Sequence, residues 1–264
     1  MTTQLIERLA IEVDGDGDAV LLIHGLGGTS NTWTPLMSAL SHFKVVRLDL
    51  PGSGRSHRVD GTLSIERFVQ AALRALSACG AQKAHVVGHS LGTIVAQHLA
   101  VLEPKIVRSL ALFGPLFAPP DAARPNIRAR AQKARSEGVP GMQSIADVLV
   151  QATISSETKS RRPTAVAYVR ESLMRQDPDG YARSCEALAD AQAVDPAKIL
   201  CPALLVTGDE DPVAPPQSVR QMGEKIQGSR VEVLRGCGHW ASLEKPEECS
   251  QLLRAFYAQR ILST

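Results

Sequence analysis

The sequence predicts an α/β fold in which a mostly parallel sheet of about eight strands is covered by helices on both faces and carries a helical insertion. Short, predominantly apolar runs such as Ala19–Ile23 and Val107–Phe113 are typical of strands buried on both faces. Segments with helical spacing of apolar residues alternate with these runs, as in parallel sheets. Between residues 114 and 195 the apolar runs stop, and helical stretches richer in arginine and proline replace them.

These patterns give the expected elements in chain order. Strands are expected at Leu5–Val13, at Ala19–Ile23, at Lys44–Leu48, from Ala84 to a turn at Ser90, and at Val107–Phe113, Ala203–Thr207 and Val231–Leu234. Core helices are expected from near Thr32 to before His42, from a Ser64 cap to Gly80, and at Leu91–Leu102, Gln217–Ile226 and Pro246–Ile261. Insertion helices are expected at Ile127–Ser136, Ser144–Val150, Thr164–Met174 and Tyr181–Ala191. We therefore expect a core domain of residues 1–114 and 196–264 and a helical cap of residues 115–195.

Bulk properties limit the classes of partner. The 264-residue chain has a formal net charge of +2 with mixed signs, so we expect neither nucleic acid nor membrane as a partner. Its five cysteines are scattered without metal-type spacing, and the N-terminus lacks the apolar core of a signal peptide. We expect a cytoplasmic protein with reduced thiols, no cofactor and no metal, and leave open whether it forms a homodimer.

The segment around Ser90 organises the chemistry. Gly88-His89-Ser90-Leu91-Gly92 follows an apolar strand and opens a helix, which is the setting of a nucleophile elbow. A side chain at either glycine would crowd the close approach of strand and helix. The strained turn would expose the Ser90 hydroxyl and direct the first helix amides toward it.

A serine hydroxyl needs a base and a group that orients the base. Two later strand ends supply candidates: Gly208-Asp209-Glu210-Asp211 and Gly236-Cys237-Gly238-His239. Carboxyl ends of parallel strands meet at one edge of a sheet, so both loops are expected near Ser90. The residues alone leave three acidic side chains open for the orienting role. His24 is expected to shape its loop and His89 to pack, rather than to transfer protons.

Taken together, these motifs resemble the α/β-hydrolase fold enzymes over essentially the whole chain. The matching segments are His24-Gly25-Leu26-Gly27-Gly28, Asp49-Leu50-Pro51-Gly52-Ser53-Gly54-Arg55-Ser56, the elbow, Gly208-Asp209-Glu210-Asp211 and Gly238-His239. The resemblance implies Ser90 as nucleophile, His239 as general base and then acid, and Asp211 as the orienting carboxylate. It also implies an oxyanion hole formed by the backbone N–H groups of Leu26 and Leu91.

The resemblance implies hydrolysis of an ester or lactone through an acyl-serine. Chain length, the helix at Tyr181–Ala191 and the pattern Gly-His-x-x-x-x-Glu-x-Pro at residues 238–246 are similar to 3-oxoadipate enol-lactonases and small carboxylesterases. The alternatives are a C–C bond hydrolase of meta-cleavage products, a cofactor-free perhydrolase and a slow, hydrolase-like signalling receptor. C–C hydrolases usually carry Gly-Asn-Ser-Met-Gly at the elbow, from which His89 and Leu91 depart. A dehalogenase is disfavoured, because residue 90 is serine rather than aspartate.

Specificity is expected to come from the cap and from a largely apolar acyl pocket. Candidate pocket walls are Trp33, Phe113, Leu116, Phe117, Met142 and Trp240. A dicarboxylate-like substrate would call for a cap arginine, for which the candidates are Arg128, Arg161, Arg170 and Arg183.

Overall fold

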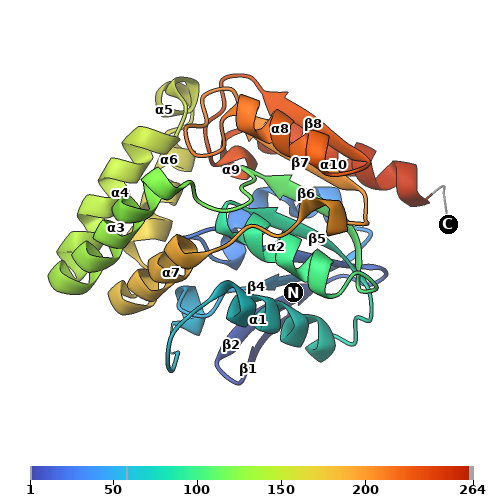
Figure 1. Cartoon of the computed structure of the whole chain (residues 1–264), viewed down its shortest axis with the longest axis horizontal. Coiled ribbons are helices and arrows are strands. Elements are labelled where there is room, and N and C mark those ends of the chain that lie inside the picture. The colour runs from blue at the N-terminus through green and yellow to red at the C-terminus, as the bar shows by residue number, and fades with distance from the viewer. Residues whose placement is uncertain (1, 58, 262–264) are drawn as a thin grey trace.

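Eight strands form one sheet in the order β1-β2-β4-β3-β5-β6-β7-β8. The computed structural model describes residues 2–57 and 59–261, and Figure 1 shows helices packed around this sheet. The sheet is parallel except where β2 pairs antiparallel with β1 and with β4. The predicted fold class is therefore confirmed. The strands are β1 Thr2–Ile6, β2 Leu9–Asp14, β3 Ala19–Ile23, β4 Lys44–Leu48, β5 Ala84–His89, β6 Val107–Phe113, β7 Ala203–Gly208 and β8 Ser229–Leu234.

The strand expected at Leu5–Val13 is in fact a hairpin of two strands. Glu7 and Arg8 form the two-residue connection and both have positive φ, 46° and 71°. Tight hairpin turns usually place glycine or asparagine at such positions. Because neither residue is present, the sequence carried no turn signal here, and the prediction of a single edge strand was wrong.

Alternate side chains of the central strands pack into two separate apolar cores, one on each face of the sheet. Leu21 and Ile23 of β3 join one core cluster, whereas Val20 and Leu22 join the other. The first cluster lies under α1 (Ile65–Ala78), α2 (Leu91–Leu102) and α8 (Pro216–Lys225), and the second under the 3-10 helix η1 (Ser30–Leu40) and α10 (Pro246–Ile261). A run that is apolar at every position is what a strand covered on both faces requires.

Helix boundaries follow local chemistry. The hydroxyl of Ser64 accepts the N–H of Arg67 at the start of α1, and Gly80, with φ of 68°, follows its end, as predicted. The segment expected as a helix from near Thr32 is a 3-10 helix beginning at Ser30. It contains Pro35, which lacks the N–H that an α-helix would use there.

The segment between β6 and β7 is helical and contains no strand. Figure 1 shows its helices stacked beside one end of the sheet. The four predicted helices are present with longer bounds, and α5 was not predicted. The elements are η3 Asp121–Ala123, α3 Arg124–Glu137, α4 Val139–Thr153, α5 Ser156–Arg161, α6 Pro163–Met174, α7 Pro178–Asp190 and η4 Pro196–Lys198. The remaining short helices are η2 Gly54–Ser56 and α9 Ala241–Glu244.

Apolar side chains from these helices complete the core. Met142, Val169, Leu173 and Tyr181 are buried in the same cluster as the inner faces of α1 and α2. Among the described residues, no helix combines the length and apolar character needed to cross a bilayer.

Candidate active site

Ser90 occupies the turn between β5 and α2 with φ of 51° and ψ of −119°. Such a φ is strained for a residue that carries a side chain. A Cβ at Gly88 would lie 2.5 Å from the carbonyl oxygen of Gly92, and one at Gly92 would overlap the carbonyl of Ile23. The Ser90 N–H donates to the carbonyl of Phe113 over 3.0 Å, which anchors the turn to the end of the neighbouring strand β6. The hydroxyl is thereby presented at the carboxyl edge of the sheet.

His239 and Asp211 lie in the loops after β8 and β7 and contact each other. His239 Nδ1 is 2.8 Å from Asp211 Oδ2, and the other carboxylate oxygen accepts the N–H groups of Val213 and Ala214 over 2.8 and 2.9 Å. Burial acts to raise the pKa of Asp211, but the imidazole and these amides outweigh it and lower the pKa below its ordinary 3.8. The ionised carboxylate then accepts Nδ1–H, which leaves Nε2 as the proton acceptor of the ring.

The two other acidic residues of this loop accept backbone N–H groups instead of contacting His239. Asp209 Oδ1 accepts the N–H of Cys237 over 3.2 Å, and Glu210 Oε2 accepts the N–H of Ser156 over 2.9 Å. Among the three acidic candidates, the geometry therefore favours Asp211 as the partner of the histidine.

The serine turn and the histidine loop meet at the end of β6. Phe113, whose carbonyl holds the Ser90 N–H, is followed by Gly114 with φ of 57°. A Cβ on Gly114 would lie 2.8 Å from Cε1 of His239. On the other side, His89 donates from Nε2 to the carbonyl of His239 over 2.9 Å. Ser90 and the His-Asp pair therefore both lie at the end of β6, and all three residues are buried.

The loop after β3 forms a tight turn against the serine. The N–H of Gly28 donates to the carbonyl of Gly25 over 3.0 Å, and Gly27 in the third position has φ of 78°. A Cβ on Gly25 would lie 2.9 Å from the Cβ of Ser90, so the backbone of the turn touches the nucleophile. Leu26 is the second residue of the turn, whose own hydrogen bond does not use the Leu26 N–H.

The other predicted oxyanion donor lies at the start of α2. The N–H of Leu91 is the first amide of that helix, for which helix geometry provides no acceptor within the helix. The positive end of the helix dipole adds to its attraction for an anion. Both predicted donors, Leu26 and Leu91, therefore adjoin Ser90.

Two further buried histidines near the site are held neutral. Burial lowers the pKa of His24, whose Nδ1–H donates to the Gly25 carbonyl over 2.7 Å while Nε2 accepts the N–H of Leu50 over 2.9 Å. Burial, with the neighbouring His239, lowers the pKa of His89 to about 3. Both rings act as fixed hydrogen-bonding groups at neutral pH.

Comparison with known proteins now identifies the family. The family model described as alpha/beta hydrolase fold matches residues 18–246, which include the serine turn and both loops of the His-Asp pair. The chain belongs to the α/β hydrolase fold family.

Relatives of this α/β hydrolase carry several activities. The (E)-2-((N-methylformamido)methylene)succinate hydrolase of Acinetobacter baylyi is 26% identical over 246 residues, which cover 92% of this chain and 91% of the relative. The 2-hydroxymuconate semialdehyde hydrolase of Pseudomonas putida is 28% identical over 268 residues, which cover 96% of this chain and 91% of the relative. The structure of a thermophilic esterase from Thermogutta terrifontis superposes with a TM-score of 0.89 at 26% identity, covering 95% of this chain and 93% of the esterase. The structure of an enol-lactonase from Burkholderia xenovorans superposes with the same TM-score and identity, covering 97% of this chain and 100% of the lactonase. The resemblance to lactonases and esterases is confirmed.

Trp33, predicted as a pocket wall of this hydrolase, belongs to the core. Its indole is fully buried in the cluster under η1 and packs edge-on against Phe113 at a centroid distance of 6.0 Å. The pocket assignment is corrected accordingly. An aromatic residue after a glycine-rich loop suits either environment, so the sequence could not distinguish them.

Trp240 and Phe117 occupy different surroundings. The ring of Trp240 lies 5.0 Å from that of His89 and 6.5 Å from that of His239, and its Nε1–H donates to the Thr153 hydroxyl over 3.0 Å. Trp240 therefore packs beside the catalytic candidates. Phe117 is half-buried, with its ring 6.0 Å from Lys225 Nζ of α8.

Three of the four candidate cap arginines have acidic partners within the cap. They form ion pairs between partly exposed side chains at 2.5–2.7 Å: Arg128 with Asp190, Arg170 with Asp147 and Arg183 with Asp179. Arg161 lines a cleft of about 490 Å³ between η1, α6 and α10, whose lining includes none of the catalytic candidates. The three paired arginines are therefore already engaged by carboxylates of the cap.

Two polar residues that the sequence analysis missed hold the turn after β3. Ser172 of α6 donates from Oγ to the Gly27 carbonyl over 2.8 Å, and Gln176 donates from Nε2 to the same carbonyl over 3.2 Å. Gln176 Oε1 accepts the N–H of Gly54 over 3.2 Å. These contacts join residues more than a hundred positions apart, so no local sequence pattern could predict them.

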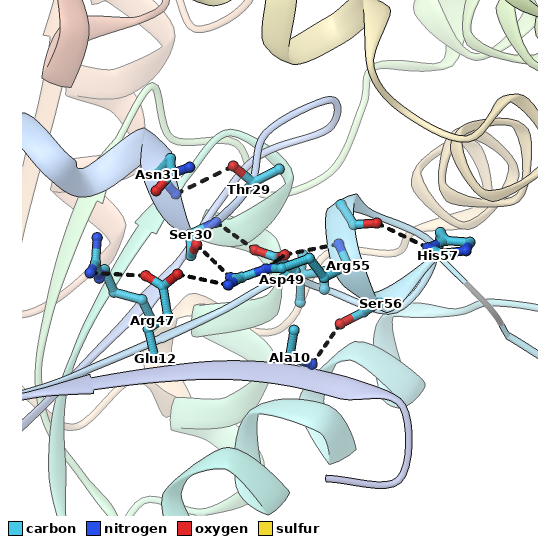
Figure 2. A network of polar contacts seen from close by, with 12 residues as sticks. Ala10, Glu12, Thr29, Ser30, Asn31, Arg47, Asp49, Arg55, Ser56 and His57 are labelled. Atoms are coloured by element: carbon cyan, nitrogen blue, oxygen red, sulfur yellow. Dashed lines mark hydrogen bonds and ion pairs between the residues drawn. The ribbon is translucent and has the colours of Figure 1, made fainter. Parts of the chain in front are cut away.

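A charged network centred on Asp49 and Arg55 reaches Ser30, which follows this turn in the chain, as Figure 2 shows. Asp49 Oδ1 accepts the N–H of Ser30 over 2.8 Å, and Oδ2 accepts Nε of Arg55 over 2.8 Å. The guanidinium of Arg55 also donates to Glu12 Oε1 over 2.8 Å, and Arg47 pairs with the other oxygen of Glu12 at 2.9 Å. Although burial acts to raise the pKa of Asp49, its hydrogen bonds, that of Arg55 foremost, lower it. The segment 49–56 thus acts as a structural brace.

In residues 2–57 and 59–261, no group of three or more His, Cys, Asp or Glu side chains is arranged to hold a metal ion. The glycine-rich turn at residues 25–28 faces the serine.

Proposed function

We propose that this protein hydrolyses a carboxylic ester or lactone through an acyl-enzyme on Ser90. The observation that carries the proposal is the contact between Asp211 and His239 beside a strained serine turn. Ser90 Oγ attacks the carbonyl carbon while His239 Nε2 takes its proton, and the oxygen that becomes negative binds the amides of Leu26 and Leu91. His239 then protonates the leaving alcohol as the C–O bond breaks, and water releases the acid by the same steps in reverse order.

We further propose that the acyl group is apolar. Beside the polar contacts of Ser172 and Gln176, two large apolar cap residues lie against the turn after β3: a Cβ on Gly27 would meet Leu173 and lie 3.6 Å from the ring of Tyr181. Three of the four cap arginines named above have carboxylate partners within the cap. A buried carboxylate on the substrate would need a cationic partner, so a dicarboxylate fits this cap less well than a hydrocarbon chain.

Steady-state hydrolysis of p-nitrophenyl esters from acetate to octanoate tests both statements. The wild-type protein is expected to turn over, preferring apolar acyl chains to strongly polar ones. Ser90→Ala is expected to lower kcat by about 10⁴-fold or more, because the nucleophile is removed. Activity that survives in Ser90→Ala would refute the serine mechanism. A single burst without turnover would instead support the receptor-like alternative.

C–C bond hydrolysis is the second candidate, favoured by the 28% identity with the 2-hydroxymuconate semialdehyde hydrolase. The same serine and His-Asp pair would serve it, but the elbow has His89 and Leu91 where such enzymes usually have asparagine and methionine. Loss of absorbance from a dienol meta-cleavage substrate, at a kcat/KM above that for every ester tested, would select this candidate.

We also propose that the protein acts in the cytoplasm. The five cysteines are odd in number and scattered along the sequence, which is usual for a protein of a reducing compartment. Cell fractionation with an antibody to the chain tests this location.

A further inference from the structure

A buried carboxylate holds the loop that carries His239. Glu244 of α9 is fully buried, and its Oε2 and Oε1 accept the N–H groups of Gly238 and Trp240, each over 3.0 Å. These amides flank His239 on both sides. A third N–H comes from the cap, where Ser155 donates to Oε2 over 2.9 Å. One carboxylate therefore joins the histidine loop to the α4–α5 junction.

The backbone of His239 is held as closely as its neighbours. Its N–H donates to the carbonyl of Thr153, the last residue of α4, over 2.8 Å. Its carbonyl accepts Nε2–H of His89, whose neutral ring keeps that donor in place. The position of the His239 Cα thus follows from contacts to the cap, to the serine turn and to Glu244.

Few side chains could replace this carboxylate. Hydrogen bonds from N–H groups to a carboxylate are short and strong, and buried amides left without an acceptor are costly. Glu244 supplies two acceptor oxygens to three amides, one of them in the cap. An amide side chain of the same shape offers a single oxygen and turns an NH₂ toward an N–H.

We propose that Glu244 is a positioning residue that sets the imidazole of His239 and ties its position to the cap through Ser155. The inference rests on the proposed function, in which His239 is the base. It assigns a role to the glutamate of the Gly-His-x-x-x-x-Glu-x-Pro segment. A displacement of about 1 Å in a catalytic group can cost on the order of 10²-fold in rate.

Glu244→Gln and Glu244→Asp test the carboxylate. Glu244→Gln is expected to lower kcat 10- to 100-fold with little change in KM, because the base moves while substrate binding persists. Glu244→Asp keeps both oxygens on a shorter arm and is expected to recover part of the loss. Glu12→Gln is the matched control: it makes the same change at another buried carboxylate, in the network of Figure 2, away from the His239 loop.

Ser155→Pro and Ser155→Ala test the link to the cap. Ser155 has φ of −63° and Ile154 before it is extended, so proline fits the backbone but removes the N–H that reaches Glu244. Ser155→Ala keeps this N–H and loses only the hydroxyl. We expect kcat to fall further in Ser155→Pro than in Ser155→Ala.

Two further readouts separate positioning from general stability. One is the acidic limb of the pH profile of kcat/KM, which we expect to shift in Glu244→Gln and not in Glu12→Gln. The other is the low-field proton NMR signal of the His239 Nδ1–H, which needs no substrate. We expect it to broaden or move in Glu244→Gln and Ser155→Pro.

The outcomes are distinct. Equal Tm losses in Glu244→Gln and Glu12→Gln, with wild-type kcat, pH limb and NMR signal per folded molecule, would overturn the proposal. Equal kcat values in Ser155→Pro and Ser155→Ala would overturn the link to the cap. If the wild-type protein hydrolyses no ester but the NMR signal responds to Glu244→Gln, positioning of His239 stands and the proposed function fails.

Discussion

At the scale of single residues, the tautomer of His239 depends on the carboxylate of Asp211. Asparagine at position 211 would have the same shape but no charge, and its NH₂ group would favour the wrong ring tautomer. We predict that Asp211→Asn lowers kcat by about 10⁴-fold with little change in KM. Steady-state kinetics on the preferred p-nitrophenyl ester measures this loss.

Asp209 provides the control for that prediction, because it lies in the same loop but accepts the N–H of Cys237. Asp209→Asn is expected to leave kcat within a few-fold of the wild type. Comparable losses in the two variants would mean that the loop as a whole, and not the contact to His239, limits the reaction.

The sequence predicted single residues well where a local motif carried them. Ser90 could be located because glycines at fixed offsets and a strand-to-helix change surround it. Gln176 and Glu244 could not be assigned roles, because their partners lie in distant parts of the chain and come together only in the fold. Trp33 was misplaced since apolar character alone does not tell a pocket wall from a core.

At the scale of elements, periodicity located the buried strands, and the failures have local causes. The hairpin at Glu7 and Arg8 lacks turn-type residues, and α5 is a helix of only 6 residues, too short to show a period. The 3-10 helix around Pro35 carries an apolar pattern that an α-helix would also carry. The structure of these three segments depends on tertiary packing, which a local sequence pattern does not reveal.

Gln176, which lies just after helix α6, holds the turn after β3. Gln176→Ala removes the donor to the Gly27 carbonyl and the acceptor for the Gly54 N–H. We predict a loss of about 1–3 kcal/mol of stability from the unpaired groups and a roughly 10-fold lower kcat, because the Leu26 amide is less well placed. Urea unfolding and the rate of Ser90 phosphonylation by an organophosphonate measure the two effects.

An exposed glutamine of the cap serves as the control. Gln151→Ala on α4 is expected to change neither quantity appreciably, because its side chain is exposed. If phosphonylation is as fast in Gln176→Ala as in Gln151→Ala, the hydrogen bonds of Gln176 do not position the turn after β3.

At the scale of the whole molecule, two buried carboxylates link stability to pH. Asp49 braces one side of the site and Asp211 the other, and both have a pKa below the ordinary 3.8 in the folded state. In the unfolded chain they bind protons more readily, so their stabilisation is complete above about pH 5 and is lost as the pH falls below 3.8 toward their folded values.

We therefore predict that the free energy of unfolding declines below about pH 4, by up to about 1.4 kcal/mol for each unit by which either pKa is depressed. Urea titrations between pH 3 and 7 measure this decline. Asp49→Asn removes one of the two carboxylates and is expected to flatten the curve on its acidic side while lowering stability at pH 7. If the free energy of unfolding of Asp49→Asn falls with decreasing pH as steeply as that of the wild type, protonation of Asp49 does not contribute to the loss of stability in acid.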